Sequence, residues 1–164
     1  MIYFISAAFM IIVDQLIKYW AVTELAPIGN INIIKGFFHL TYVENSGAAF
    51  SMLEGKQTFF IIITFAAFFL FYYIYKTGIV SGKLANWAGT FVAGGAIGNF
   101  IDRLRLGYVI DMFNFELIDF PVFNFADICI TVGGALFVLI IWLDYLNERR
   151  EKKAAAEKAA GEDA

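Results

Sequence analysis

Four stretches of about twenty mostly apolar residues run through this chain, and each is long enough to cross a bilayer as a helix. They cover residues 2–22, 57–75, 84–104 and 124–143. The composition agrees, because 60% of the residues are hydrophobic and 16% are charged, against roughly 45–50% and 25% in a soluble domain. We therefore predict an α-helical membrane protein with four transmembrane helices. This excludes a soluble globular enzyme, a disordered chain and a nucleic-acid-binding protein.

The charged residues are concentrated at the end of the chain. Of the 27 charged residues (12 basic and 15 acidic), 11 lie between Asp144 and Asp163, which leaves 16 for the first 143 residues. We therefore treat residues 1–150 as one membrane domain. Residues 151–164 are rich in Ala, Glu and Lys, and we expect them to form a cytoplasmic tail, either a frayed helix or a disordered segment.

The first apolar stretch does not have the features of a cleaved signal peptide. No basic region precedes it, and Asp14 and Lys18 interrupt it. Because these two residues are spaced i, i+4, they share a helix face and can neutralise each other. A structural ion pair is the favoured interpretation, and a functional role is the alternative, since a charge inside a span is costly and often functional.

The distribution of lysine and arginine between the loops predicts the orientation in the membrane. The link 76–83 has two lysines and no acidic residue, and the tail opens with four basic residues between Arg149 and Lys153. The loops 23–56 and 105–122 instead carry more acidic than basic residues. Both termini and the short link should therefore be cytoplasmic, and the two long loops should face outward.

Two segments in the outward loops carry strand signals. Residues 36–43 read Gly-Phe-Phe-His-Leu-Thr-Tyr-Val, in which Leu40 and Tyr42 alternate with more polar residues. Such alternation among aromatic and β-branched residues indicates a strand, and residues 108–115 are similar. We expect a small extracytoplasmic sheet of apolar character on the membrane surface.

The third span carries polar residues near its outer end. Gly94 and Gly98 form a small-xxx-small seam that lets a neighbouring helix approach closely. Asn99 and Arg103 are spaced i, i+4 and project from one helix face, with Asp102 beside Arg103. Arg103 either faces a functional site or extends to the lipid headgroups, and the spacing alone does not decide between the two.

Asp111 and Asp127 form the strongest candidate for a catalytic pair. Asp111 lies among apolar residues in the outer loop, and Asp127 follows Pro121 and the N-cap candidate Asn124. At the third helical position Asp127 could simply close a capping-box-like bond. However, the loop that joins the two aspartates starts and ends at the same outer membrane level, so their carboxylates can meet.

Two facing carboxylates would share one proton over a range of pH. One then acts as general base on a water molecule. The other polarises a carbonyl group and donates a proton to the leaving amine. The helix N-terminus favours the anionic form of Asp127, which points weakly to Asp127 as the base, and the assignment stays open.

No metal or cofactor site is indicated. The chain has one histidine, His39, and one cysteine, Cys129, which cannot build a His-rich metal cluster or an intrachain disulfide. The motifs of serine hydrolases, zinc proteases and phosphate-binding loops are absent, as is the Asp-Thr-Gly signature of soluble aspartic proteases.

Several blocks of the sequence closely resemble the lipoprotein signal peptidase (signal peptidase II) family. The matching blocks are Asp14-Gln15 with Lys18; Asn45-Ser46-Gly47-Ala48-Ala49-Phe50; Gly98-Asn99 with Asp102-Arg103; Val109 with Asp111; and Phe123-Asn124 with Ala126-Asp127. Five blocks in the family's order, on four spans, make a specific signal. One departure is Met112, where the family usually has Phe, and the adaptable Met side chain should preserve the packing.

The resemblance implies roles for these residues. Asp111 and Asp127 would be the catalytic pair, and Asn45, Asn99, Arg103 and Asn124 would contact substrate or hold the pair in place. Asp14 and Lys18 would support the site. The implied fold has four helices, an extracytoplasmic β-cradle and a short surface helix.

The resemblance also implies an activity and a location. The substrates would be prolipoproteins with a diacylglyceryl group on the lipobox cysteine, cut on the amino side of that cysteine without a cofactor. Globomycin would inhibit the enzyme, and membrane lipid would surround it. It would be a multi-pass protein of the bacterial inner membrane, with its active site near the outer face.

Two other classes of protein remain as alternatives. A small ion or proton-coupled transporter would also place ionisable residues inside the membrane, and a non-catalytic assembly subunit could pack through the glycine seam. A transporter should carry polar residues through the whole bilayer depth. The second span has no charged residue, and the third and fourth carry theirs at one end, which favours the peptidase.

Overall fold

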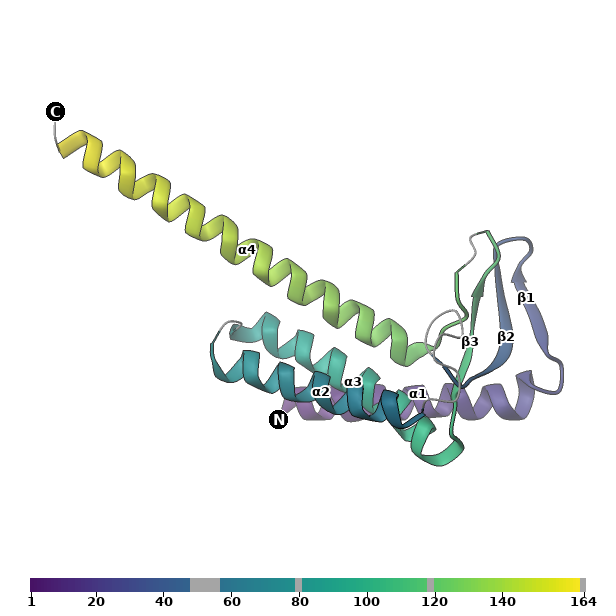
Figure 1. The fold of residues 1–164 in the computed structure, drawn as a ribbon. Coiled ribbons are helices and arrows are strands. Elements are labelled where there is room, and N and C mark those ends of the chain that lie inside the picture. Colours follow the sequence, from purple (N-terminus) through teal and green to yellow (C-terminus); the bar gives the residue numbers. More distant parts are fainter. Residues whose placement is uncertain (48–56, 79–80, 118–119, 163–164) are drawn as a thin grey trace.

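The structure is a computed structural model that describes residues 1–47, 57–78, 81–117 and 120–162. Within these ranges the chain forms four α-helices, one π-helical turn and three strands (Figure 1). In chain order the elements are α1 (Ile2–Trp20), η1 (Ala21–Leu25), β1 (Asn30–Ile34), β2 (Phe38–Asn45), α2 (Gln57–Lys76), α3 (Gly82–Leu106), β3 (Val109–Phe115) and α4 (Phe125–Glu162).

All four predicted spans fall on helices, but only part of the membrane prediction is supported. Two helical segments among the described residues are long and apolar enough to cross a membrane, Ile2–Leu25 and Phe125–Ala155. Helix α3 contains several glycines together with Asn, Asp and Arg residues, and these lower its mean hydropathy. Helix α4 continues past the predicted end at 143 and runs through the tail to Glu162.

The helices leave apolar side chains outside and bury charged ones. On α1, Phe4 is 83% exposed and Phe9 65% exposed, whereas Asp14 and Lys18 are 1% and 2% exposed. A soluble protein has the reverse arrangement, because water solvates charges and excludes apolar surface. This surface is suited to lipid rather than to water.

A three-stranded antiparallel sheet packs at one end of the helices (Figure 1). The central strand β2 pairs with β1 and with β3, and the strand predictions at 36–43 and 108–115 are confirmed by β2 and β3. Strand β1 was not predicted. The expected short surface helix is not found among the described residues, and residues 48–56 between β2 and α2 lie outside them.

One face of the sheet is fixed to the end of α1. Leu40 and Tyr42, the apolar positions of the predicted alternation, pack against a buried cluster of four residues from η1 and β3. The cluster consists of Ala21, Leu25, Ile110 and Met112. Met112 is fully buried in it, so its side chain fills a core position, as expected.

Helix α3 makes close contacts with both α1 and α4. The glycine seam faces α1, since a Cβ on Gly94 would lie 3.2 Å from Met10 Cβ and one on Gly98 would lie 2.6 Å from Asp14 Oδ2. A Cβ on Gly95 would overlap the carbonyl oxygen of Ala126 on α4. The predicted seam is confirmed, and a second close contact, with α4, accompanies it.

Candidate active site

The end of α3 determines where Asp111 lies. Gly107 ends α3 in the left-handed conformation with φ 86°, which glycine adopts without steric cost. The chain then enters β3, where Asp111 lies opposite Val43 of β2. A register shift separates this pair from the next cross-strand pair, which is Leu40 of β2 with Phe113 of β3.

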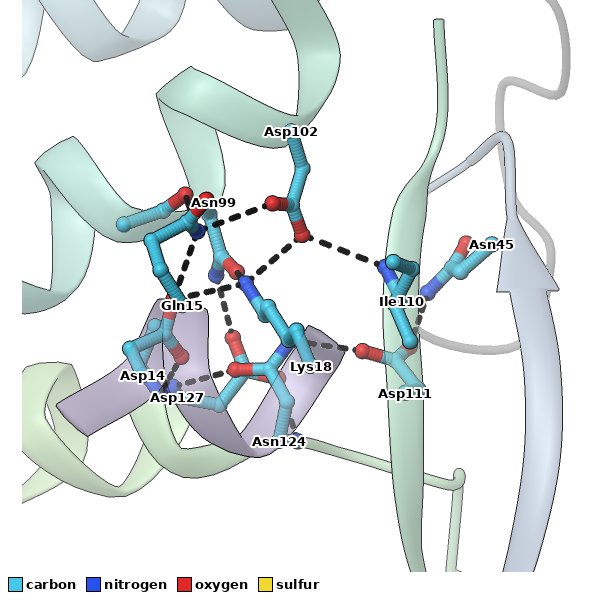
Figure 2. Close-up of polar contacts among 12 residues, drawn as sticks. Asp14, Gln15, Lys18, Asn45, Asn99, Asp102, Ile110, Asp111, Asn124 and Asp127 are labelled. Atoms are coloured by element: carbon cyan, nitrogen blue, oxygen red, sulfur yellow. Dashed lines mark hydrogen bonds and ion pairs between the residues drawn. The ribbon is translucent and has the colours of Figure 1, made fainter. Parts of the chain in front are cut away.

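The carboxylate of Asp111 is enclosed by two amide groups. Its side chain is 2% exposed, and Asn124 Nδ2 donates to Oδ1 at 2.6 Å while Asn45 Nδ2 donates to Oδ2 at 2.8 Å (Figure 2). Burial raises the pKa of Asp111 to about 7, with the negative charge of Asp127 adding to the effect and the two amides opposing it. Asp111 can therefore hold a proton near neutral pH.

Asp127 is fixed at the start of α4 by a reciprocal capping interaction. The backbone N–H of Asp127 donates to Asn124 Oδ1 at 3.0 Å, and the backbone N–H of Asn124 donates to Asp127 Oδ2 at 3.1 Å. This confirms the capping prediction. The other oxygen, Oδ1, accepts from Asn99 Nδ2 at 2.7 Å, so capping leaves this carboxylate available to the site.

Asn124 connects the two aspartates. Its side chain is fully buried, and its Nδ2 bonds both Asp111 Oδ1 and, at 3.1 Å, Asn99 Oδ1. Its Oδ1 accepts from the N–H of Asp127. One amide therefore fixes the strand carboxylate relative to the helix carboxylate, and the structure brings Asp111 and Asp127 together.

Both aspartates line a pocket of about 260 Å³. Asn99 and Arg103 line it from α3, as their shared helix face predicted, which places the Arg103 cation in the pocket beside the carboxylates. The remaining lining residues are Asn45, Gly47, Val109, Phe120, Pro121, Val122 and Phe123. Residues 120–123 thus form part of the pocket lining, and Phe123 forms a bridge with Phe113 of β3.

A buried charged cluster lies behind the pocket. Lys18 bridges Asp14 at 3.0 Å and Asp102 at 2.8 Å, which confirms the predicted pairing of Asp14 with Lys18. Both carboxylates also accept from the backbone: Ala126 N–H donates to Asp14 Oδ1 at 2.9 Å, and Ile110 N–H donates at 3.3 Å to Asp102 Oδ2, the oxygen that also contacts Lys18. The cluster therefore ties α1 to α3, α4 and β3.

Sequence reasoning did not assign site roles to Asp102 and Gln15. Gln15 Nε2 donates to Asp102 Oδ1 at 3.0 Å and to Asp14 Oδ2 at 3.2 Å, so both residues belong to the charged cluster. The available signal was the resemblance, whose matching blocks contain both residues. Spacing alone could not find them, since it does not show how α1 and α3 face each other.

No group of three or more His, Cys, Asp and Glu residues that could hold a metal ion occurs in the part of the chain that the structure describes. His39 pairs with Glu116 on the sheet, with Nε2 and Oε2 2.7 Å apart. Cys129 is a buried free thiol on α4. Neither residue lines the pocket.

Comparison with known proteins identifies the family. Residues 6–143 match the family Signal peptidase (SPase) II. The chain belongs to the signal peptidase II family. It is 48% identical over 134 residues to the lipoprotein signal peptidase of Caldanaerobacter subterraneus subsp. tengcongensis, with 80% of this chain and 90% of that protein covered. It is 44% identical over 140 residues to the lipoprotein signal peptidase of Lactiplantibacillus plantarum, with 85% and 92% covered.

Solved structures agree with the signal peptidase II assignment. A bacterial membrane enzyme structure at 2.3 Å resolution matches with a TM-score of 0.80 and 34% identity, covering 88% of this chain and 90% of that chain. A second bacterial membrane enzyme structure, at 1.9 Å, matches with a TM-score of 0.73 and 35% identity, covering 84% and 90%. The chain is therefore a membrane protein with an enzyme fold, and these comparisons give the transporter alternative no support.

Proposed function

We propose that this protein is a membrane-embedded aspartic endopeptidase that removes the signal peptide from lipid-modified prolipoproteins. The observation that carries the proposal is the pair Asp111 and Asp127, which line one pocket and are joined by Asn124. The raised pKa of Asp111 supports a pair that holds one proton near neutral pH.

This pair can hydrolyse a peptide bond with no further catalytic group. The ionised carboxylate takes a proton from water, and the water oxygen attacks the scissile carbonyl carbon while the protonated carboxyl hydrogen-bonds the carbonyl oxygen. As the carbon–nitrogen bond breaks, the protonated carboxyl gives its proton to the leaving amine. The proton from water remains on the other carboxylate, so the pair again holds one proton.

Neighbouring side chains prepare the pocket for this reaction. Asn45 and Asn124 fix the orientation of the Asp111 carboxylate, and Asn99 fixes that of Asp127. We assign Arg103, which lines the same pocket, to contact substrate and to balance the negative charge of the pair. Such preorganised groups need no rearrangement when charge develops in the transition state.

An apolar pocket beside the catalytic pocket supports a lipid-modified substrate. It has a volume of about 360 Å³ and shares Phe120, Phe123 and Asp127 with the catalytic pocket. Its other lining residues are Phe115, Ile128, Thr131 and Val132. Ile128 and Val132 are 39% and 38% exposed on α4, so an acyl chain could reach this pocket from the lipid.

We further assign four membrane spans to α1–α4, with both termini in the cytoplasm of a bacterium and the sheet at the outer face of the inner membrane. The lysines of the 76–83 link and the basic start of the tail support this orientation. In Figure 1 the N-terminus, the C-terminal end of α2 and the N-terminal end of α3 lie at the end of the helices opposite the sheet. We expect globomycin to compete with substrate for the pocket between α3 and β3.

The test is cleavage of a defined substrate by the purified protein in lipid or detergent. We expect cleavage of a prolipoprotein that carries a diacylglyceryl cysteine, on the amino side of that cysteine, and little cleavage of the same chain without the lipid. Mass spectrometry of the two products locates the cut. Absence of cleavage of the lipidated substrate would exclude the proposed activity.

A further inference from the structure

Lys18 is a cation with almost no access to solvent. Its side chain is 2% exposed, and its ammonium group contacts three oxygen atoms. These are Asp102 Oδ2 at 2.8 Å, Asn99 Oδ1 at 2.9 Å and Asp14 Oδ2 at 3.0 Å. An ammonium has three protons to donate, so the three contacts satisfy it. Two of them neutralise carboxylates, whereas the third reaches a residue of the catalytic pocket.

That third contact fixes the orientation of the Asn99 amide (Figure 2). Its oxygen faces two donors, the Lys18 ammonium and Asn124 Nδ2. Its nitrogen therefore faces Asp127 and donates to Oδ1 at 2.7 Å. If the amide were flipped, its NH₂ group would face the two donors and its oxygen would face the Asp127 carboxylate, so these contacts would be repulsive. In the observed orientation the buried cation polarises the amide, which strengthens its hydrogen bond to Asp127.

The two aspartates consequently differ in their surroundings. Asp111 receives its hydrogen bonds from the neutral amides of Asn45 and Asn124 and is 2% exposed. Asp127 receives the amide that Lys18 polarises, and it also lies at the positive N-terminal end of α4. The negative charge of the pair is therefore better stabilised on Asp127.

We propose that Lys18 is a positioning residue for the catalytic pair, which acts through Asn99 to hold Asp127 as the ionised base and leaves the shared proton on Asp111. The inference rests on the proposed function, since it assigns the two roles that the peptidase mechanism requires. It also gives Lys18 a role in the proposed mechanism, in addition to its ion pairs with Asp14 on α1 and Asp102 on α3.

The other charged groups around this path come from several elements. Asp14 on α1 and Asp102 on α3 contact Lys18 directly, and Arg103 and Asp111 line the pocket with Asp127. The thiol of Cys129 on α4 lies near Asp14. With Lys18 the buried cluster of Asp14, Lys18 and Asp102 has a formal charge of −1, and without it the charge is −2, from the two remaining carboxylates.

Replacement of Lys18 by a neutral residue should therefore make Asp127 harder to ionise. In Lys18→Gln we expect the acidic limb of the kcat/KM profile, which reports ionisation of the base in the free enzyme, to move to higher pH by about one unit. In Lys18→Arg the charge is kept, and the limb should stay at its original pH even if the maximal rate falls.

Gln15→Met is the matched control for loss of structure. Gln15 holds the same two carboxylates as Lys18, at 3.0 and 3.2 Å, but it is neutral, and its third hydrogen bond goes to the Gly98 backbone carbonyl oxygen at 3.3 Å. A purely structural role for the cluster predicts similar shifts of the limb in Gln15→Met and Lys18→Gln. The proposal predicts a lower thermal stability in Gln15→Met with an unchanged acidic limb.

A second variant and a second measurement cover the case in which Lys18→Gln does not fold. In Lys18→Gln with Asp102→Asn the cluster keeps its formal charge of −1 but lacks the cation beside Asn99, so the limb should still move to higher pH.

Infrared spectra at pH 6 test the protonation states directly. The band of a protonated carboxyl should be lost in Asp111→Asn and retained in Asp127→Asn.

These outcomes separate the inference from the proposed function. A wild type that does not cleave lipidated prolipoprotein overturns the function itself. If the wild type cleaves it, two results would overturn the inference and leave the function standing. One is an acidic limb that stays in place in both neutral variants of Lys18. The other is a carboxyl band that is lost in Asp127→Asn but not in Asp111→Asn. A shifted limb together with the expected bands supports it.

Discussion

At the scale of single residues, Asn124 and the two aspartates show what the sequence could and could not provide. Asp111 was identifiable because an ionisable residue stands among apolar neighbours, and Asp127 because the loop between them starts and ends at the same membrane level, so that the two carboxylates can meet. Sequence reasoning identified the cap at Asn124 but not its bonds to Asp111 and Asn99. Those bonds depend on how β3 and α3 meet α4, which local spacing does not determine.

The raised pKa of Asp111 predicts how stability depends on pH. Because the folded-state pKa of about 7 lies above the ordinary value of 3.8, the folded protein holds a proton that the unfolded chain releases. The stabilising contribution is present at low pH and is lost as pH rises from about 4 to 7, by at most about 1.4 kcal/mol per pH unit. Asp111→Asn removes this dependence.

Thermal unfolding of wild type and Asp111→Asn between pH 5 and pH 8 measures the effect. We expect the stability of the variant relative to wild type to increase as the pH rises through this range. A difference between the two proteins that does not change with pH would show that Asp111 ionises in the folded state as it does in water.

At the scale of elements, the length of the apolar stretches predicted the helices, and the alternation of apolar with polar residues predicted two of the three strands. Strand β1 was missed because Asn30–Ile34 is short and two of its five residues are asparagine, which is uncommon in strands. Its pairing with β2 depends on the turn at Gly36, with φ 71°. The sequence carries a turn signal, because Lys35 and Gly36 follow two isoleucines. Hairpin loops differ in length and geometry, so this pair alone did not predict a strand before the turn.

The α3–α4 contact is sensitive to single methyl groups, and adjacent glycines of α4 provide a matched pair. A Cβ on Gly133 would lie 2.6 Å from Val92 Cγ2 and 2.7 Å from the Ala88 carbonyl oxygen, whereas one on Gly134 would meet nothing within 4 Å. We expect Gly133→Ala to destabilise the protein by about 1–3 kcal/mol. Gly134→Ala should be neutral or stabilising by up to about 1 kcal/mol. Thermal unfolding in detergent compares them, and equal effects would contradict the packing described for α3 and α4.

The apolar pocket on α4 predicts an effect on substrate affinity rather than on chemistry. Val132 lines this pocket, whereas Val138 is 69% exposed on the same helix and is not among the lining residues. A tryptophan at 132 should fill the space that we propose for an acyl chain and raise the apparent KM about tenfold, which corresponds to roughly 1.4 kcal/mol. Val138→Trp is the control, and a KM that is unchanged in Val132→Trp would assign the acyl chain to another surface.

At the scale of the whole molecule, apolar side chains are exposed on the outside, and the charged residues that are buried among the described residues lie at or beside the candidate site. The sequence predicted this from the small number of charges outside the tail. The position of the sheet over the ends of α1 and α3 could not be predicted, because it depends on contacts between Leu40, Tyr42 and the η1 turn. These contacts join segments far apart along the chain.

The proposed orientation predicts which surfaces face outward. In a Cys129→Ser background, a cysteine at Glu116 on the sheet side should react with a membrane-impermeant maleimide in intact cells. A cysteine at Thr77, at the opposite end of the helices, should react only after the inner membrane is permeabilised. The reverse pattern of labelling would invert the proposed topology.

The most direct test of the account is the rate of prolipoprotein cleavage by variants of the two aspartates. Asp111→Asn and Asp127→Asn replace one carboxylate each with a group of nearly the same shape, and both should reduce kcat to background while the protein remains folded and still binds the lipidated substrate. Cleavage at a rate near that of wild type by either variant would contradict a mechanism that shares one proton between Asp111 and Asp127.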